Sequence, residues 1–320
     1  MPILRHLDEL PADARGGAVA IGNFDGVHLG HARIMQTLLA RAREYDGPAV
    51  VFTFDPHPVR LLRPEKSPPP LTWTERKAEL LANLGVDWVI AYPTDEALLR
   101  LSARAFFDRI VRNSLDARAM VEGPNFYFGH KREGTIDVLR RLTGEAGVQL
   151  DIVAPVEMHD GLVSSSRVRR LIQHEGAVGL ARQMLSAPYR LRGIVTHGAG
   201  RGAKIGFPTA NLEGIDTLLP AHGVYAALAS VEQDRVPAAV HIGPNPTFGE
   251  NASKVEVHLI GRDQALYGRP LEVDFLDRLR DIQPFDSVEL LVKQLHRDVA
   301  EASAVGEGVL SAECGLGNAE

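Results

Sequence analysis

The sequence contains a single cysteine, Cys314, in 320 residues. One cysteine excludes an intramolecular disulfide and gives no support to a cysteine-based metal site. No uninterrupted apolar run reaches the roughly 20 residues that a membrane-crossing helix needs, so we expect no membrane partner. The first residues mix acidic and basic side chains and lack the apolar core of a signal peptide. These absences predict a cytoplasmic protein.

The sequence also lacks an excess of basic residues. The formal net charge is -6, so no global basic field favours DNA or RNA as a partner. No internal repeats are visible. The chain does have the composition of a globular protein with a sizeable core, at 45% hydrophobic and 24% charged residues. Its length predicts two domains, at about 150 residues per domain.

The first half alternates short apolar runs with helix-like stretches. A helix with one apolar face is predicted over 31–44, and Thr72 with Glu75 resembles a capping box that opens a helix ending at Leu84. Alternating strands and helices predict an α/β domain with a parallel sheet covered on both faces. The predicted buried strands are 17–22, 48–54, 86–92, 117–123 and 148–154.

The second half changes character near residue 187. From there the pattern is β, with apolar runs separated by glycine, proline and asparagine. One helix follows over 287–302, where Asp286 can cap the first turn and Glu289 can reach back. Its predicted buried stripe consists of Val288, Leu291, Val292, Leu295 and Val299. We therefore predict domains at 1–187 and 188–303, followed by a loose tail over 304–320.

The stretch "AVAIGNFDGVHLGH" ends a predicted strand and places two histidines, His28 and His31, three residues apart. In a parallel α/β sheet, ligands bind at the carboxyl ends of the strands. The next helix offers free N–H groups to an anion, and Gly26 and Gly30 let the backbone approach it closely. The other interpretation is a capped turn with two surface histidines. The flanking strand and helix favour a phosphate site, in which imidazole donates hydrogen bonds to developing charge.

Three further stretches follow in order. "TFDPHP" (53–58) ends the second strand, and "EGPNFYFGHKREGT" (122–135) follows a later one. "VSSSRVRR" (163–170) opens a helix with hydroxyls and arginines that suit a triphosphate, although alone it also fits a capped helix with a solvated basic face. His-x-Gly-His is the signature of the nucleotidyltransferase superfamily, and the ordered series resembles the adenylyltransferase module of bacterial FAD synthetase.

This resemblance implies a Rossmann-like nucleotidyltransferase domain in which ATP and FMN give FAD and pyrophosphate. The reaction would use Mg²⁺ and form no covalent enzyme intermediate. The resemblance implies that His28 and His31 contact the ATP phosphates and the transition state. It assigns no role to His130. It implies that ATP and flavin are bound by Asn23, Asp25, Gly26, Gly30, His57, Asn125, Ser165, Ser166 and Arg169.

In the second half, "THGAGRGAKIGFPTANL" (196–212) carries four glycines before Phe-Pro-Thr-Ala-Asn. It is not a P-loop, because no Gly-Lys-Ser/Thr follows, and a flexible hairpin loop is the other interpretation. Thr209 and Asn211 favour a functional site, since a hydroxyl and an amide oxygen two positions apart can share one Mg²⁺. Downstream, strand alternation puts Glu256 and His258 on one face, although such a carboxylate is often merely solvated.

Together these stretches resemble the riboflavin kinase module, a small β-barrel with a terminal helix that phosphorylates riboflavin from ATP. The resemblance implies that Thr209 and Asn211 bind Mg²⁺ and that Glu256 is the base that accepts the hydroxyl proton. Lys204 departs from the hydroxyl that such kinases often have at its position. The remaining ATP- or flavin-binding residues implied are Gly198, Gly202, Lys204, Gly206, Pro208 and Asn245.

The two resemblances span residues 15 to 302, in the order found in the bifunctional bacterial riboflavin kinase/FAD synthetase family. They imply an enzyme that uses riboflavin, FMN and ATP and that forms FMN and FAD. Two alternatives stay open. One is an adenylyl- or cytidylyltransferase for another acceptor with a regulatory barrel, which Thr209, Asn211 and Glu256 argue against. The other is a flavin- or nucleotide-binding protein without turnover, which the intact His28 and His31 argue against. The sequence does not predict the oligomeric state.

Overall fold

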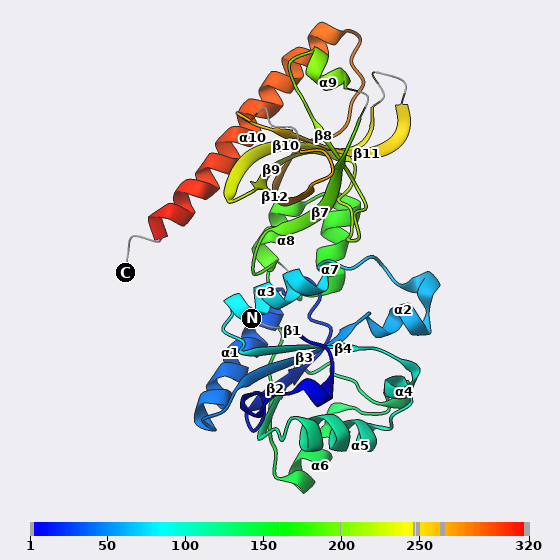
Figure 1. The fold of residues 1–320 in the computed structure, drawn as a ribbon, viewed down its shortest axis with the longest axis vertical. Coiled ribbons are helices and arrows are strands. Elements are labelled where there is room, and N and C mark those ends of the chain that lie inside the picture. Colours follow the sequence, from blue (N-terminus) through cyan, green and yellow to red (C-terminus); the bar gives the residue numbers. More distant parts are fainter. Residues whose placement is uncertain are drawn as a thin grey trace. The chain divides into compact units, whose positions relative to one another are not determined.

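The computed structural model describes residues 3–316, except 160, 199, 246, 248, 249 and 263–265. Contacts divide the chain into two compact units. The first contains the chain up to residue 68 together with 72–165, and the second contains 69–71 together with the chain from 166 onward. Each unit has its own β-sheet (Figure 1). The domain boundary near residue 187 that the sequence predicts stays a prediction.

The first unit is built on a six-stranded parallel sheet with strand order β1-β4-β3-β2-β5-β6. This confirms the predicted parallel α/β domain, and the five predicted strands become β2 to β6. The edge strand β1 was not predicted, because two residues carry no periodicity. The strands are β1 (Ile3–Leu4), β2 (Ala18–Ile21), β3 (Ala49–Asp55), β4 (Trp88–Pro93), β5 (Ala119–Glu122) and β6 (Gln149–Ile152).

Helices connect these strands. Helix α1 packs against β2, β3 and β5, while the core joins Ile21, Phe52 and Ile90 of the sheet to Phe107 and Ile110 of η4. The helices are η1 (Leu7–Glu9), η2 (Ala12–Ala14), α1 (Leu29–Glu44), α2 (Pro58–Leu62), η3 (Pro64–Lys66), α3 (Thr74–Asn83), α4 (Glu96–Leu99), α5 (Ala103–Phe106), η4 (Phe107–Ser114), η5 (His130–Arg132) and α6 (Ile136–Ala146).

The strand order creates a switch point beside β2. The chain runs from β2 to β3 and β4 on one side, and then returns to β5 on the other side of β2. In open parallel sheets, ligands bind at the carboxyl ends of the strands at such a point. The loop that carries His28 leaves the carboxyl end of β2, so the fold brings the histidine motif to this edge.

The second unit is a closed antiparallel barrel with strand order β10-β11-β8-β7-β12-β9. This confirms the predicted β-barrel with a terminal helix. Its strands are β7 (Tyr189–Thr196), β8 (Ala210–Glu213), β9 (Gly223–Val231), β10 (Asp234–Asn245), β11 (Glu250–Leu259) and β12 (Pro270–Arg280). Its helices are α7 (Ser165–Arg170, with Ser165 in the first unit), η6 (Leu171–Glu175), α8 (Val178–Met184), α9 (Arg201–Lys204) and α10 (Val288–Leu316).

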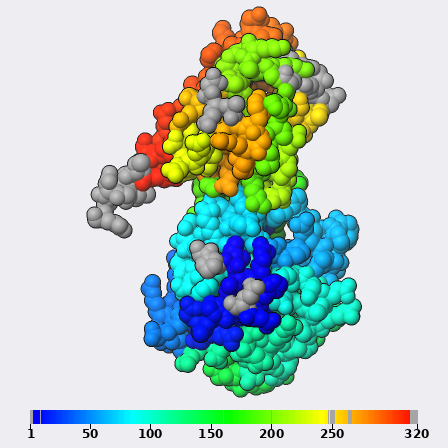
Figure 2. Space-filling model, in the orientation of Figure 1, coloured from blue at the N-terminus to red at the C-terminus, as the bar shows by residue number. Residues whose placement is uncertain are grey.

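The predicted loose tail is wrong for residues 304–316, because α10 continues to Leu316; residues 317–320 lie outside the described part of the chain. The helix packs on β9, β10 and β12, and its red C-terminal half lies against the yellow barrel strands in Figure 2. Contact is made by small buried residues, Ala302 and Gly306, and by an ion pair between Arg235 and Glu313. Small residues leave no apolar stripe, so periodicity missed this half of the helix.

The start of α10 also differs from the prediction. Ser287, not Asp286, caps the helix, since the Ser287 hydroxyl accepts a hydrogen bond from the Leu290 N–H at 3.3 Å. Val288 is 45% exposed, and the other four residues of the predicted buried stripe, Leu291, Val292, Leu295 and Val299, are only partly buried. Within the described residues, no helix combines the length and the apolar character needed to span a membrane.

Candidate active sites

The two histidines of the first unit hold each other at the start of α1. His28 is the N-cap residue, and its Nδ1 accepts a hydrogen bond from the His31 N–H at 3.3 Å. His31 Nδ1 accepts from the His28 N–H at the same distance, and the two rings stack with centroids 3.6 Å apart. Because both Nδ1 atoms accept, each neutral ring carries its proton on Nε2. Each ring therefore has an Nε2–H donor that these two hydrogen bonds do not use.

Burial keeps this histidine pair uncharged. It lowers the pKa of His28 from 6.5 to about 4, although the Asp25 carboxylate acts in the opposite direction. The pKa of His31 is well below its usual range because of burial first, and then because of His28 and the nearby Lys77. Both rings are therefore neutral at pH 7 and can donate hydrogen bonds without bringing charge to the site.

The loop before the histidines is strained and tied down. Phe24 and Val27 adopt left-handed backbone angles, with φ of 45° and 40°. Asp25 accepts from the backbone N–H and the hydroxyl of Thr72, at 3.1 and 3.3 Å. The sequence predicted that Thr72 caps α3. This prediction is wrong, because the helix begins at Thr74 and Thr72 is not its N-cap residue. The Ser165 hydroxyl donates to the Asp25 carbonyl at 2.9 Å and holds the same loop from its other side.

The glycine between the histidines has a steric role. A Cβ at Gly30 would lie 3.0 Å from Cε1 of His28, so a larger residue would push against the stacked ring. Asn23, at the end of β2, has a buried amide oxygen without a hydrogen-bond partner among the described residues. That oxygen is an acceptor that a ligand can use.

The structure brings together a subset of the predicted residues in the first unit. His57 lies after β3 as the N-cap of α2, where its Nδ1 accepts from the Val59 N–H at 3.0 Å, and Asn125 is exposed after β5. Ser166 and Arg169 belong to the second unit, where Arg169 donates to the Pro69 carbonyl, so their predicted place over a triphosphate stays a prediction. The residues gathered in the loop are Asn23, Asp25, Gly26, His28, Gly30, His31 and Ser165.

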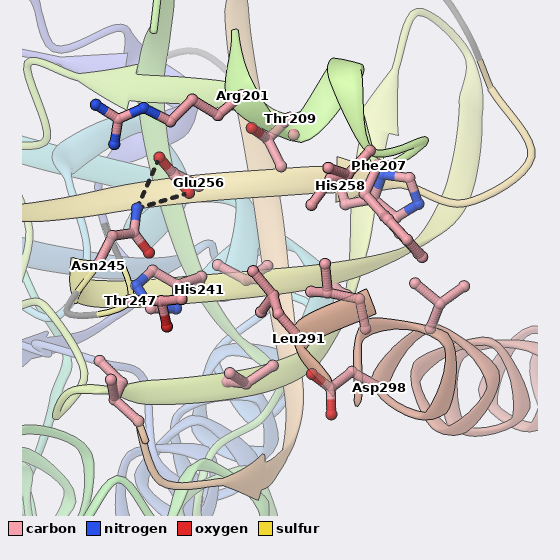
Figure 3. Close-up of a pocket in the computed structure, with 18 of the residues that line it drawn as sticks. Arg201, Phe207, Thr209, His241, Asn245, Thr247, Glu256, His258, Leu291 and Asp298 are labelled. Carbon is pink, nitrogen blue, oxygen red and sulfur yellow. Dashed lines mark hydrogen bonds between the residues drawn. The ribbon is translucent and has the colours of Figure 1, made fainter. Parts of the chain in front are cut away.

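The second unit contains a cavity of about 150 Å³ between the barrel and α10. Asn211, Glu256 and His241 are directly paired across β8, β11 and β10, so they form one row along its wall. Figure 3 shows Glu256 and Asn245 facing each other, and the Asn245 amide donates to both carboxylate oxygens at 3.3 and 3.4 Å. Thr209 lines the cavity just before β8.

Two glycines let the loop before β8 close over Asn211. A Cβ at Gly198 would lie 2.1 Å from the Asn211 amide nitrogen, and one at Gly202 would lie 2.3 Å from the Phe207 carbonyl oxygen. No side chain fits at either position without a shift. Of the predicted residues, Gly202, Thr209, Asn211, Asn245 and Glu256 line the cavity. Gly198, Lys204, Gly206 and Pro208 are described but are not among its lining residues.

The opposite wall is largely apolar and comes from the end of β12 and from α10. At its base Arg280 makes a bidentate ion pair with the buried Asp298, with nitrogen–oxygen distances of 2.7 to 3.1 Å. Burial lowers the pKa of His241, which donates from Nε2 to the Pro244 carbonyl at 3.2 Å. The apolar lining residues after β12 and on α10 are Ile282, Phe285, Leu291, Leu295 and Val299.

Sequence reasoning missed several functional candidates. Arg201, which lies inside the glycine stretch but was not singled out, lines the cavity together with His241, Thr247, Arg280 and Asp298. The apolar positions of α10 were predicted as a buried stripe, but nothing indicated that they face a cavity. Among the described residues, no group of three or more His, Cys, Asp or Glu side chains is arranged to hold a metal ion.

Both halves of the chain match family models. Residues 10–167 match the model described as FAD synthetase, and residues 185–305 match the one described as Riboflavin kinase. A bifunctional riboflavin kinase/FMN adenylyltransferase from Pseudomonas fluorescens is 36% identical over 307 residues, which cover 95% of this chain and 98% of the relative. The chain belongs to the bifunctional riboflavin kinase/FMN adenylyltransferase family. The family resemblance predicted from the motifs is thus confirmed.

Other members of this family are similar over nearly the whole chain. The bifunctional riboflavin kinase/FMN adenylyltransferase of Escherichia coli K12 is 33% identical, covering 93% of this chain and 96% of its own. A solved structure described as a macrolide-efflux protein from Streptococcus pneumoniae is 30% identical, with a TM-score of 0.83, and covers 95% of this chain and 98% of its own. The description as an efflux protein applies to the Streptococcus pneumoniae protein. The likeness between that protein and this chain is one of fold and sequence.

Proposed function

We propose that this chain phosphorylates riboflavin with ATP to give FMN, and then transfers an adenylyl group from ATP to FMN to give FAD and pyrophosphate. One observation carries the proposal: a single chain contains two differently built sites, each in the unit that matches the corresponding family model. One site presents two neutral donors and the other a carboxylate beside a hydroxyl and an amide.

In the kinase reaction, Glu256 accepts the proton of the riboflavin 5′-hydroxyl as that oxygen attacks the γ-phosphorus of ATP, and ADP leaves as the bond from the γ-phosphorus to the bridging oxygen breaks. The hydrogen bonds from Asn245 support this role, because they fix the carboxylate along the cavity wall. The apolar wall formed by Leu291, Leu295 and Phe285 suits a flat, largely apolar ring system.

The residues at the end of the glycine loop fit a magnesium ion. Mg²⁺ prefers oxygen donors and is often held by one or two protein groups together with substrate phosphates. Thr209 and Asn211 offer a hydroxyl and an amide oxygen on the wall that also carries Glu256. When bound, the ion would supply charge neutralisation for the ATP phosphates. The loop around those phosphates would be shaped by Gly198, Gly202, Lys204, Gly206 and Pro208.

In the adenylyl transfer, the FMN phosphate attacks the α-phosphorus of ATP, and pyrophosphate leaves. The nucleophile is already an anion, so the site needs hydrogen-bond donors and orientation rather than a base. His28 and His31 would direct their Nε2–H groups to the phosphates, and Gly26 and Gly30 would let the backbone approach them. The residues that would hold nucleotide or flavin are Asn23, Asp25, His57, Asn125 and Ser165. Ser166 and Arg169 would close over the triphosphate, and Mg²⁺ would be present with ATP. We place both reactions in the cytoplasm.

A chromatographic time course tests this function directly. Purified protein is incubated with riboflavin, ATP and Mg²⁺, and flavins are separated at intervals. FMN that appears and then gives way to FAD is the expected result. Retention of unconverted riboflavin would instead indicate a binding protein without turnover. FMN without FAD, even when FMN is supplied, would indicate that the histidine site serves another acceptor.

A further inference from the structure

Helix α3 carries two adjacent cations that are both buried but differently paired. Arg76 is 5% exposed and forms an ion pair with Glu79 at 2.9 Å. Lys77 is 8% exposed, and its Nζ donates to the Thr53 hydroxyl at 3.3 Å. Among the described residues, no carboxylate makes an ion pair with Lys77. The helix therefore buries one cation that is in an ion pair and one that is hydrogen-bonded to a hydroxyl.

An ammonium buried without a direct ion pair is costly for the folded state. It loses hydration, and a single neutral hydroxyl replaces only part of that loss. Burial accordingly lowers the pKa of Lys77, whereas the Asp25 and Asp55 carboxylates, the acidic groups that act on it, raise the pKa. A buried ammonium with unused donors is a group that an incoming anion can complete.

The surroundings of Lys77 connect it to the histidine site. The Thr53 hydroxyl donates in turn to the Asn23 carbonyl at 3.2 Å, at the start of the loop that carries His28. The positive charge of Lys77 contributes to the lowered pKa of His31, so the two groups lie within electrostatic reach. Asn23 also has the buried, unpartnered amide oxygen described above. A buried ammonium whose one hydrogen bond goes to a neutral hydroxyl thus lies near a buried amide oxygen without a partner among the described residues.

We propose that Lys77 is a phosphate-contact residue of the adenylyltransferase site, whose ammonium receives a phosphate of ATP or the phosphate of FMN. The inference rests on the proposed function. The two histidines supply neutral donors, and Lys77 supplies the positive charge that this pair lacks. The motifs did not mark it, because a lysine in an amphipathic helix pattern is expected on the solvated face.

The test compares Lys77→Met with Lys77→Arg and with Arg76→Met, a matched control that removes the paired cation. FAD formation from FMN and ATP is measured in the full chain, and FMN formation reports on the other unit. Lys77→Met should lower kcat/KM for FAD formation by about 10- to 100-fold, the effect of losing one charge-assisted hydrogen bond. Lys77→Arg should recover part of the loss, and Arg76→Met should leave kcat/KM close to wild type. A raised KM for ATP would indicate the triphosphate, and a raised KM for FMN its phosphate.

Thermal unfolding separates a ligand contact from a structural role. Inorganic pyrophosphate should raise the unfolding midpoint of the wild type, and His28→Asn assigns that rise to this site by weakening it. Lys77→Met should lose most of the rise, and its ligand-free midpoint should stay near the wild type. A lowered ligand-free midpoint with an unchanged pyrophosphate response would overturn the proposal. Wild-type protein that makes no FAD refutes the proposed function itself; FAD formation that Lys77→Met leaves unchanged refutes only the role of Lys77.

Discussion

The two sites are assembled in opposite ways. The histidine site comes mainly from one short segment, in which a capping box and a strained loop fix His28 and His31 within a single turn. The kinase cavity draws Asn211, His241, Glu256, Arg280 and Asp298 from four strands and one helix. A site encoded in one segment depends on local backbone geometry, whereas a site spread over a barrel depends on strand register and helix docking.

The two sites also differ in the chemistry that they provide. The FMN phosphate is an anion before it reacts, and the first site offers two neutral imidazoles as hydrogen-bond donors. The riboflavin hydroxyl must lose a proton, and the second site places a carboxylate, Glu256, on the cavity wall. One chain therefore separates a reaction that needs donors from a reaction that needs a base.

Removing the carboxylate should have the largest effect and should be confined to one reaction. Glu256→Gln keeps the size of the side chain but cannot accept the hydroxyl proton. We expect kcat for FMN formation to fall by about 10²- to 10⁴-fold. FAD formation from supplied FMN should be nearly unchanged. Glu272→Gln, on a barrel strand outside the cavity, is the control. Equal loss of both reactions would break the comparison between two independent sites.

Removing one imidazole should produce the reverse pattern. His28→Asn keeps a side-chain acceptor at the N-cap of α1 but lacks the Nε2–H donor. FAD formation should fall by about 10²- to 10³-fold, the usual effect of losing one such donor, and FMN should accumulate from riboflavin. His28→Ala removes the cap as well, so it should be similarly inactive but less stable. A His28→Asn variant that makes FAD normally would show that the ring only caps the helix.

The sequence predicts the fold well where side-chain periodicity is strong. The strands β2 to β6 and the β character of the second half were predicted because apolar runs alternate with turn residues, whereas the barrel itself was implied by the resemblance to the riboflavin kinase module. The far half of α10 was missed because its contact face is made of Ala302 and Gly306. Thr72 was predicted to cap α3, but it bonds to Asp25 instead. A hydroxyl before a helix has two competing partners, and only the tertiary fold decides between them.

The candidate sites follow the same division. His28, Gly30 and His31 could be predicted because their spacing and flanking elements already describe a turn at a helix N-terminus. Arg280 and Asp298 are distant in sequence from the glycine loop, and only barrel closure and helix docking bring them to the same cavity. Lys77 could not be predicted from an amphipathic pattern, because its burial depends on β3 and the loop after β2.

Acid should destabilise the first unit because His28 is buried uncharged. Its pKa is about 4 when folded and 6.5 when exposed, so the unfolded chain binds a proton that the folded chain does not. The contribution of His28 to stability should be constant above pH 6.5 and fall as the pH drops toward 4. At about 1.4 kcal/mol per unit, this shift corresponds to about 3 kcal/mol. Urea unfolding at several pH values measures it, and His28→Asn should flatten the curve. An unchanged slope in that variant would contradict a neutral, buried His28.

The smallest expected effect concerns the half of α10 that lies beyond the kinase cavity. A Cβ at Gly306 would lie 2.9 Å from Pro237, whereas a Cβ at Gly308 meets nothing within 4 Å. Gly306→Leu should therefore lower the free energy of unfolding by about 1–3 kcal/mol through overpacking. Gly308→Ala should raise it by up to about 1 kcal/mol through helix propensity. FMN formation should be nearly unchanged in both variants, because Leu291, Leu295 and Val299 line the cavity from the other half. If Gly306→Leu leaves the unfolding transition in place, this half of the helix does not anchor the kinase site to the barrel. The site would then depend on register within the barrel and on the first turns of α10 alone.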